Sequence, residues 1–265
     1  MWWLLGCVSE EPADQEDPSA VEIAAYDPLE WVDPFIATGG HGAQIANTNP
    51  GPSVPFGMTH VGPDTRQVSG APSFYHCAGY WWEDTHIHGF SHNHAHGMGV
   101  SDFGGVAIMP VVGWQDAYTT PRGRMTAFSH ERESASPGWY EVEMDNGVQV
   151  RLTATLHGGH TRVTWPAGAE PVLLLDLGPS IASTSVPEAW VSWTPDDPVV
   201  TGFQRLSGNY SGRFGGLRTS FEMVLDPAPV GGGAWDAPEA PVEGVTAASG
   251  TNAGTWFRFP EGTTT

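Results

Sequence analysis

The chain has 265 residues, a formal net charge of −20 and 40% hydrophobic residues, so it can bury a sizeable core and wholesale disorder is excluded. It contains 34 glycines and 23 prolines, a content that favours a loop-rich β-architecture over helical bundles. All ten basic residues are arginine, and this acidic balance argues against nucleic acid as a partner, because nucleic-acid-binding surfaces are positively charged.

Residues 1–30 are interpreted as a leader remnant followed by an acidic, disordered tether. Leu4-Leu5-Gly6-Cys7 resembles the bacterial lipobox, in which the cysteine is lipidated, so Cys7 is the predicted lipidation site and any membrane contact would run through this anchor. Residues 8–28 are acidic and favour an extended linker. A signal peptide needs about 7–15 apolar residues, and too few precede Gly6, so the alternative is that Cys7 is incidental.

A β-hairpin is predicted over residues 140–152, where apolar and polar residues alternate on both sides of Asp145-Asn146-Gly147. If both apolar sets lie on one face, Met144 stands opposite Val148, which requires a three-residue loop. Gly147 then supplies the left-handed residue of this bulged turn. We therefore prefer the three-residue loop to a two-residue Asn-Gly turn.

The rest of residues 31–265 is predicted to be one all-β domain, a β-sandwich with few helices. Two continuous apolar runs, Val106–Val112 and Val172–Leu177, predict strands covered on both faces. Further expected strands are Arg162–Trp165, Val200–Leu206, Ser220–Leu225 and Thr255–Phe259. A turn or two of helix is expected near Pro187–Val191, and residues 227–254, rich in Gly, Pro and Ala, are expected to form a long surface loop. The chain stops just past the last apolar strand without a closing element, so we expect it to be a truncated form.

Five histidines crowd one segment, and they are the most conspicuous candidates for chemistry: His86, His88, His92, His94 and His96. On a strand, the last three would share one face, and neutral imidazoles bind zinc or copper well. The alternative is that these glycine-flanked histidines lie in a loop and line a polar pocket. We favour the pocket, and with it substrate contacts for His92 and His94, because no Cys or Glu frames the cluster at metal-site spacing.

Aromatic residues gather in the same part of the chain: Phe74, Tyr75, Tyr80, Trp81 and Trp82. Sugar rings stack on aromatic faces while carboxylates and arginines bind their hydroxyls. The neighbouring Asp64, Arg66, Glu83 and Asp84 therefore suit a saccharide site. The alternative for each aromatic is a place in the core. Glycosidic hydrolysis also needs two carboxylates at a set distance. The candidates are Asp64, Glu83, Asp84, Asp102 and Glu131, but sequence alone fixes no such distance.

Several blocks, in their order and spacing, resemble the N-terminal domain of glycoside hydrolase family 92, the calcium-dependent exo-α-mannosidases. The blocks are Val32-Asp33-Pro34-Phe35-Ile36-Ala37-Thr38-Gly39-Gly40-His41-Gly42, Val54-Pro55-Phe56-Gly57-Met58, Pro63-Asp64-Thr65-Arg66, Cys77-Ala78-Gly79-Tyr80, Gly89-Phe90-Ser91-His92-Asn93-His94, Phe128-Ser129-His130-Glu131, Ala135-Ser136-Pro137-Gly138-Trp139-Tyr140 and Leu152-Thr153-Ala154-Thr155. The resemblance covers residues from about Trp31 to the C-terminus.

The resemblance implies a β-sandwich of the galactose-mutarotase type that packs on a C-terminal (α/α)6 barrel. In the family the catalytic carboxyl groups and most calcium ligands belong to that barrel, so no catalytic residue and no metal ligand is expected here. The N-terminal domain is implied to contribute loops to the substrate pocket. The positions carried over are Asp64, Gly79 and Tyr80, with Phe74 where the family often has a tryptophan.

The resulting hypothesis is the N-terminal, carbohydrate-binding half of an exported α-mannosidase that removes terminal mannose from glycans with inversion, while this chain alone is inactive. The expected location is the cell envelope, as a lipoprotein, or the medium. The alternative is a self-standing carbohydrate-binding lipoprotein without hydrolase activity. The reading frame beyond Thr265 discriminates the two, since a long helical continuation favours the enzyme.

Overall fold

The computed structural model describes residues 27–40, 47–69, 74–181, 184–238 and 240–264. The chain divides into two units, residues 1–31 and 32–265. The described part of the first unit holds one 3-10 turn, η1 (Pro28–Trp31), and Cys7 lies outside the described residues. No helix among the described residues is long and apolar enough to cross a membrane.

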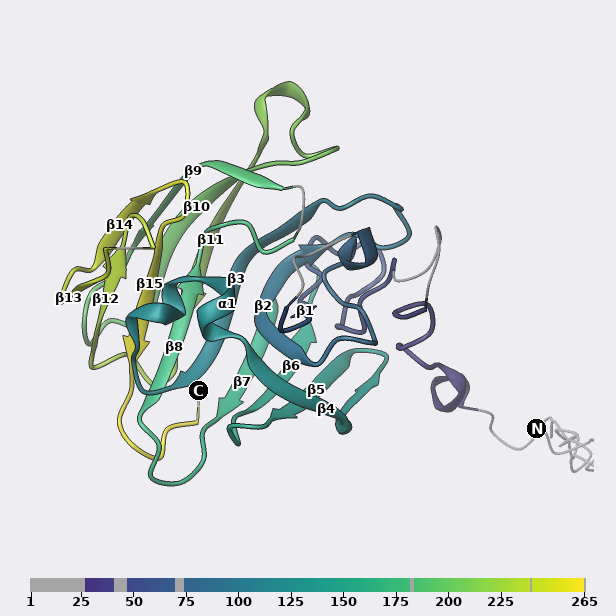
Figure 1. Ribbon diagram of the computed structural model, residues 1–265, viewed down its shortest axis with the longest axis horizontal. Helices are drawn as coiled ribbons and strands as arrows, with labels where there is room; N and C mark the ends of the chain where they lie inside the picture. The colour runs from purple at the N-terminus through teal and green to yellow at the C-terminus, as the bar shows by residue number, and fades with distance from the viewer. Residues whose placement is uncertain (1–26, 41–46, 70–73, 182–183, 239, 265) are drawn as a thin grey trace, which may run out of the picture. The chain divides into compact units, whose positions relative to one another are not determined.

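The second unit is built almost wholly of antiparallel strands, which confirms the all-β prediction (Figure 1). Its strands are β1 (Gly62–Arg66), β2 (His86–His94), β3 (Phe103–Val112), β4 (Thr126–Ser136), β5 (Trp139–Met144), β6 (Gln149–Ala154), β7 (Gly159–Thr164), β8 (Pro171–Asp176), β9 (Ser185–Ser192), β10 (Val199–Ser207), β11 (Leu217–Val224), β12 (Gly231–Trp235), β13 (Val242–Glu243), β14 (Ala247–Gly250) and β15 (Gly254–Arg258). Its helical pieces are η2 (Phe74–His76), η3 (Asp116–Thr119), α1 (Pro121–Arg124) and η4 (Arg213–Gly215).

The described strands form two sheets. The larger runs in the order β13-β12-β15-β8-β3-β2-β4-β5-β6-β7, with β1 paired to β2, and the smaller runs β11-β10-β9-β14. A buried glutamine connects them: Gln204 of β10 accepts a hydrogen bond from the Val106 amide of β3 at 2.9 Å and donates to the Leu177 carbonyl at 2.7 Å. Because both sheets contribute to one apolar core, the domain is a β-sandwich.

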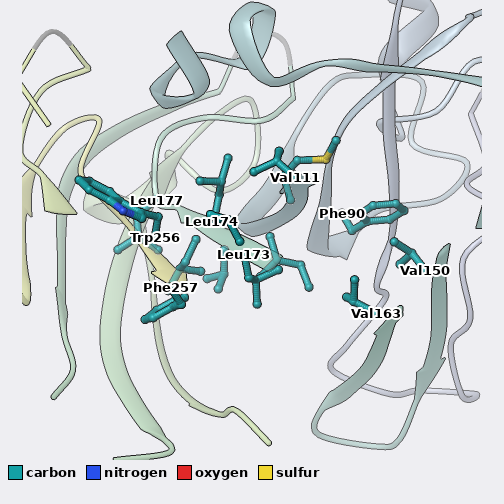
Figure 2. Close-up of a cluster of buried hydrophobic side chains, with 14 of the residues drawn as sticks. Phe90, Val111, Val150, Val163, Leu173, Leu174, Leu177, Trp256 and Phe257 are labelled. Atoms are coloured by element: carbon teal, nitrogen blue, oxygen red, sulfur yellow. The ribbon is translucent and has the colours of Figure 1, made fainter. Parts of the chain in front are cut away.

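The core is densest around β8, whose six residues are all buried. Leu173 and Leu174 lie among side chains from β3 and β15, including Val111, Trp256 and Phe257 (Figure 2). Strand β8 pairs with β3 on one side and with β15 on the other, so it has no free edge. This placement explains the continuous apolar run that predicted the strand, because both of its faces are covered.

The predicted hairpin is confirmed in register and in turn type. Val142 pairs with Val150, and the Met144 amide donates to the Val148 carbonyl at 3.0 Å. Gly147 has φ +80°, the left-handed conformation that the three-residue loop requires.

The helix expected near Pro187–Val191 is wrong, because these residues belong to β9. Val186, Ala189 and Val191 are buried while their neighbours are exposed, and β9 pairs with β10 and β14. The missing amide hydrogen of Pro187 falls where the register with β10 shifts, so no ladder bond is lost there.

The surface loop expected over residues 227–254 is also wrong, since this segment contains β12, β13 and β14. Its glycines mark close approaches. A Cβ added to Gly232 would lie 2.0 Å from the Trp256 carbonyl oxygen, and one on Gly233 would lie 2.4 Å from the Trp256 ring. Two glycines of β12 are therefore required by Trp256 of β15, Gly232 by its backbone and Gly233 by its ring.

Candidate functional site

Three residues predicted from the sequence meet beneath the β1–β2 pair. Asp64 lies in β1 opposite Gly89 of β2, where the register shifts, and its side chain is fully buried. The Asp64 Oδ1 atom lies 2.9 Å from Nε2 of His94, whose own side chain is 1% exposed. The His94 Nδ1–H donates to the carbonyl of His60 at 2.9 Å. Both ring nitrogens thus face oxygens, and Nε2 also lies 3.1 Å from Oγ of Ser91.

Gly79 is the third residue of this group, and the contact between Asp64 and His94 leaves no room for a side chain at position 79. Its φ is +85°, and an added Cβ would lie 2.4 Å from Oδ1 of Asp64 and 2.8 Å from Nε2 of His94. The Gly79 carbonyl accepts a hydrogen bond from the Thr65 amide at 2.9 Å. Any larger residue at position 79 would therefore separate Asp64 from His94.

The electrostatics of this group favour the charged form of Asp64. Burial alone would raise the pKa of Asp64, but the charge of His94 and the hydrogen bond to it lower the pKa below its ordinary value. The second oxygen of Asp64, Oδ2, has no hydrogen-bond partner among the described residues. The neighbouring His88 is neutral, because burial lowers its pKa to about 3. Asp64 is thus a buried carboxylate with one oxygen still able to accept a hydrogen bond.

Tyr80, predicted to contact substrate, lies fully buried and points into a second polar cluster. Its hydroxyl donates to the carboxylate of Glu133 at 3.0 Å, and Tyr140 donates to the same carboxylate at 2.8 Å. His130 Nδ1 lies 2.7 Å from it, and the Glu133 side chain is only 1% exposed. Burial and the charge of Glu133 raise the pKa of Tyr80, so the phenol remains a donor.

Sequence reasoning missed Glu133, although a signal for it existed. Tyr140 belongs to the inward set of the predicted hairpin, and a buried tyrosine hydroxyl needs an acceptor. Glu133 pairs with Val142 across β4 and β5, and it is the acceptor for two such hydroxyls. The neighbouring Glu131, which the sequence offered as a candidate, is exposed instead.

The histidine cluster lies mainly on a strand, β2, and not in the loop that we favoured. His92 Nδ1–H donates to the Val106 carbonyl at 2.8 Å, which leaves Nε2 with its lone pair. His92 lines a groove of about 830 Å³ between β7 and β11, whose apolar wall includes Val163 and Phe221. Burial lowers the pKa of His92, so its ring is neutral. His94, two residues on, belongs to the Asp64 group instead.

The remaining candidates are separated from these clusters or engaged by structural partners. Asp84 lies buried 2.7 Å from Nε2 of His76. Asp102 accepts hydrogen bonds from the amides of Phe103 and Ser211 at 2.7 and 2.8 Å. Phe74 begins η2, and its side chain lies outside the described part of the structure. Among the described residues, no three His, Cys, Asp or Glu side chains are placed to hold a metal ion.

Comparison with known proteins identifies the family to which the chain is similar. The model of the glycosyl hydrolase family 92 N-terminal domain matches residues 31–265. The chain belongs to this family. The resemblance stated from the sequence blocks is thereby confirmed, and the β-sandwich carrying Asp64, Gly79 and Tyr80 is this family's N-terminal domain.

Solved structures agree on the fold. A family 92 α-mannosidase from Bacteroides thetaiotaomicron, solved in complex with mannoimidazole, superposes with a TM-score of 0.76 at 24% identity, over 89% of this chain and 31% of that one. An inverting family 92 mannosidase of the same organism gives a TM-score of 0.74 at 24% identity, over 89% of this chain and 30% of that one.

A curated relative, described as an uncharacterized secreted glycosidase of Arthroderma benhamiae, is 27% identical over 164 residues, which are 57% of this chain and 20% of the relative. The chain therefore spans about a fifth of that relative and about a third of the solved mannosidases.

Proposed function

We propose that this chain is the N-terminal, substrate-holding domain of an exported α-mannosidase that hydrolyses terminal α-mannosides of glycans with inversion. The observation that carries the proposal is the family match over residues 31–265. The secreted glycosidase among its relatives supports export. Lipidation of Cys7 and placement in the cell envelope remain part of the proposal and rest on the sequence alone.

Within this proposal, the domain positions sugar and leaves bond cleavage to groups outside the chain. Inverting hydrolysis needs two carboxyl groups about 6.5–9.5 Å apart with a water between them. Asp64 and Asp84 are each committed to a buried histidine, and Asp102 to backbone amides. These engagements support the assignment of the general acid and general base to a C-terminal (α/α)6 domain.

Calcium is proposed on the same terms. Among the described residues, no three His, Cys, Asp or Glu side chains are placed to bind it together. In the proposed enzyme most of the calcium ligands belong to the C-terminal domain.

Exposed apolar residues support a partner domain. Phe56, Met58 and Leu156 are 102%, 71% and 50% exposed, and the Met58 amide donates to the Leu156 carbonyl at 2.8 Å, so two of the three are adjacent. Large exposed apolar side chains that gather on one surface mark an interaction site. We propose that the C-terminal domain covers this surface.

The test is to assay the 265-residue chain on an aryl α-mannoside with calcium and to titrate it with methyl α-mannoside. We expect weak binding and no hydrolysis. Clear turnover would overturn the assignment of the chemistry to another domain, and the absence of any mannoside binding would overturn the substrate-holding role.

A further inference from the structure

Trp82 is partly exposed, although neighbouring groups hold both its backbone and its ring. Its amide donates to the Thr38 carbonyl at 3.0 Å, and its carbonyl accepts from His130 Nε2 at 2.6 Å. The indole stacks on the His130 ring with centroids 3.8 Å apart and planes 8° apart, and the Phe35 ring meets it at 5.3 Å and 69°. Even so, Trp82 is 38% exposed. Both its backbone and its ring are therefore fixed before any ligand arrives.

His130, on which Trp82 stacks, is held by a buried carboxylate. His130 lies 2.7 Å from the buried carboxylate of Glu133, which also holds the hydroxyls of Tyr80 and Tyr140. One carboxylate thus connects Tyr80, a residue carried over from the family's pocket, to the ring that supports Trp82. A surface side chain held by a buried network loses little conformational entropy on binding, and this raises affinity.

Other tryptophans of equal exposure lack this support. Trp139 and Trp190 are 37% and 39% exposed. Trp139 begins β5 and Trp190 lies within β9, where its nearest aromatic ring is Phe203 at 6.4 Å. Among these three, Trp82 alone lies outside the strands and stacks closely on a hydrogen-bonded histidine.

We propose that the exposed indole of Trp82 is a platform for a second sugar ring of a mannose-containing oligosaccharide. This inference rests on the proposed function. An indole offers a flat apolar face to the C–H face of a hexose, while its neighbours are polar. Glu83, next in the chain, is partly buried, and its Oε1 accepts from the Gly40 amide at 2.8 Å. In this proposal the first sugar is held elsewhere on the domain, and only a longer chain also contacts Trp82.

The proposal predicts a preference for length that depends on Trp82. Methyl α-mannoside and α-mannobiose are titrated into the 265-residue chain, with binding followed through the indole N–H signals in two-dimensional NMR. We expect the disaccharide to bind about five- to tenfold more tightly than the monosaccharide. Trp82→Ala should abolish this difference and leave monosaccharide binding unchanged. Trp82→Phe should retain part of it.

The matched controls are Trp139→Ala and Trp190→Ala, which remove equally exposed indoles and should keep the preference. Circular dichroism and thermal unfolding of each variant verify that it is folded. A preference that survives in Trp82→Ala, or that is lost equally in the controls, would overturn the platform. Mannoside binding without any length preference in the wild type would also overturn the platform but leave the proposed function standing. If the wild type binds neither sugar, the proposed function fails and the platform fails with it.

Discussion

Two regions of the same sheet bury their residues in opposite ways. Around β8, β15 and β12, here termed the apolar centre, the interior consists mainly of aliphatic and aromatic side chains (Figure 2). Around β1, β2 and residues 76–84, here termed the polar wall, the fully or nearly fully buried residues include Asp64, Asp84 and His94. The apolar centre gains free energy from burial without directional demands, whereas the polar wall depends on directional hydrogen bonds such as that between Asp64 and His94. Stability and site geometry are therefore expected to respond to different substitutions.

Arg124 links the two regions. Its side chain is 1% exposed, it forms an ion pair with Asp176 of β8, and its Nε–H donates to the His88 carbonyl of β2 at 2.8 Å. The end of α1 thus fixes the polar wall to the apolar centre, and a change in one region can be felt in the other.

The largest effect is expected in the apolar centre. Trp256 is 1% exposed and stacks on Trp114 with centroids 3.7 Å apart. Trp256→Ala should lower the free energy of unfolding by about 3–5 kcal/mol, because the lost contacts leave a cavity. Urea denaturation measures the change, and Trp139→Ala at the surface should cost less than about 1 kcal/mol. Equal losses of unfolding free energy in both variants would contradict the larger contribution of the apolar centre to stability.

How far the sequence could predict this molecule follows the same division. The 140–152 hairpin was predictable to its register because its determinants are local, namely one alternation and one glycine in the left-handed conformation. Strand β12 was not, because Gly232 and Gly233 are explained only by the backbone and the ring of Trp256 on a neighbouring strand. A pattern of single residues cannot represent a partner that is distant in the chain.

In the candidate site, too, some contacts could be predicted from the sequence and others could not. The family resemblance brought forward Asp64 and Gly79, the histidine cluster brought forward His94, and the fold places the three in contact. It could not reveal that Tyr80 and His130 share Glu133, since that meeting depends on how β4 bends beside residues 80–82. The register of β4 with β5 shifts between Phe128 and Glu133, and a bulge of this kind has no clear sequence signal.

An intermediate effect, dependent on pH, is expected from the polar wall. Asp64→Asn keeps the shape but removes the charge that pairs with His94, and should cost about 1–3 kcal/mol at pH 7. Because the pKa of Asp64 is lowered on folding, its contribution is present above the unfolded carboxyl pKa of about 4 and is lost as pH falls through the folded value.

The difference in the free energy of unfolding between the wild type and Asp64→Asn should therefore become smaller as the pH falls. Urea denaturation between pH 7 and pH 3 would measure it. Glu222→Gln, at an exposed carboxyl, is the control and should show no such narrowing. A gap that stays constant with pH would mean that Asp64 is not ionised in the folded protein.

The smallest effect is expected where the polar wall meets solvent, at His130, whose side chain is 29% exposed. The hydrogen bond to Glu133 raises the pKa of His130 against the opposing effect of burial, and the charges of Glu133 and Glu83 add to the rise. A raised folded pKa stabilises the protein fully below the unfolded value of about 6.5, and this stabilisation is lost as pH rises through the folded value. His130→Gln should therefore cost about 1 kcal/mol at pH 5.5 and progressively less above neutrality, as denaturation at several pH values would measure.

The exposed His160 provides the matched control for this last substitution. His160→Gln should show no such dependence on pH, since no carboxylate bond of that kind is formed there. If the stability cost of His130→Gln depends on pH in the same way when Glu133 is replaced by Gln, the carboxylate that raises the pKa of His130 is not Glu133. If the dependence disappears with Glu133, then one buried carboxylate governs both the hydroxyl of Tyr80 and the protonation of His130. A polar wall built this way would transmit a change in its interior to Trp82, which stacks on His130 at the surface.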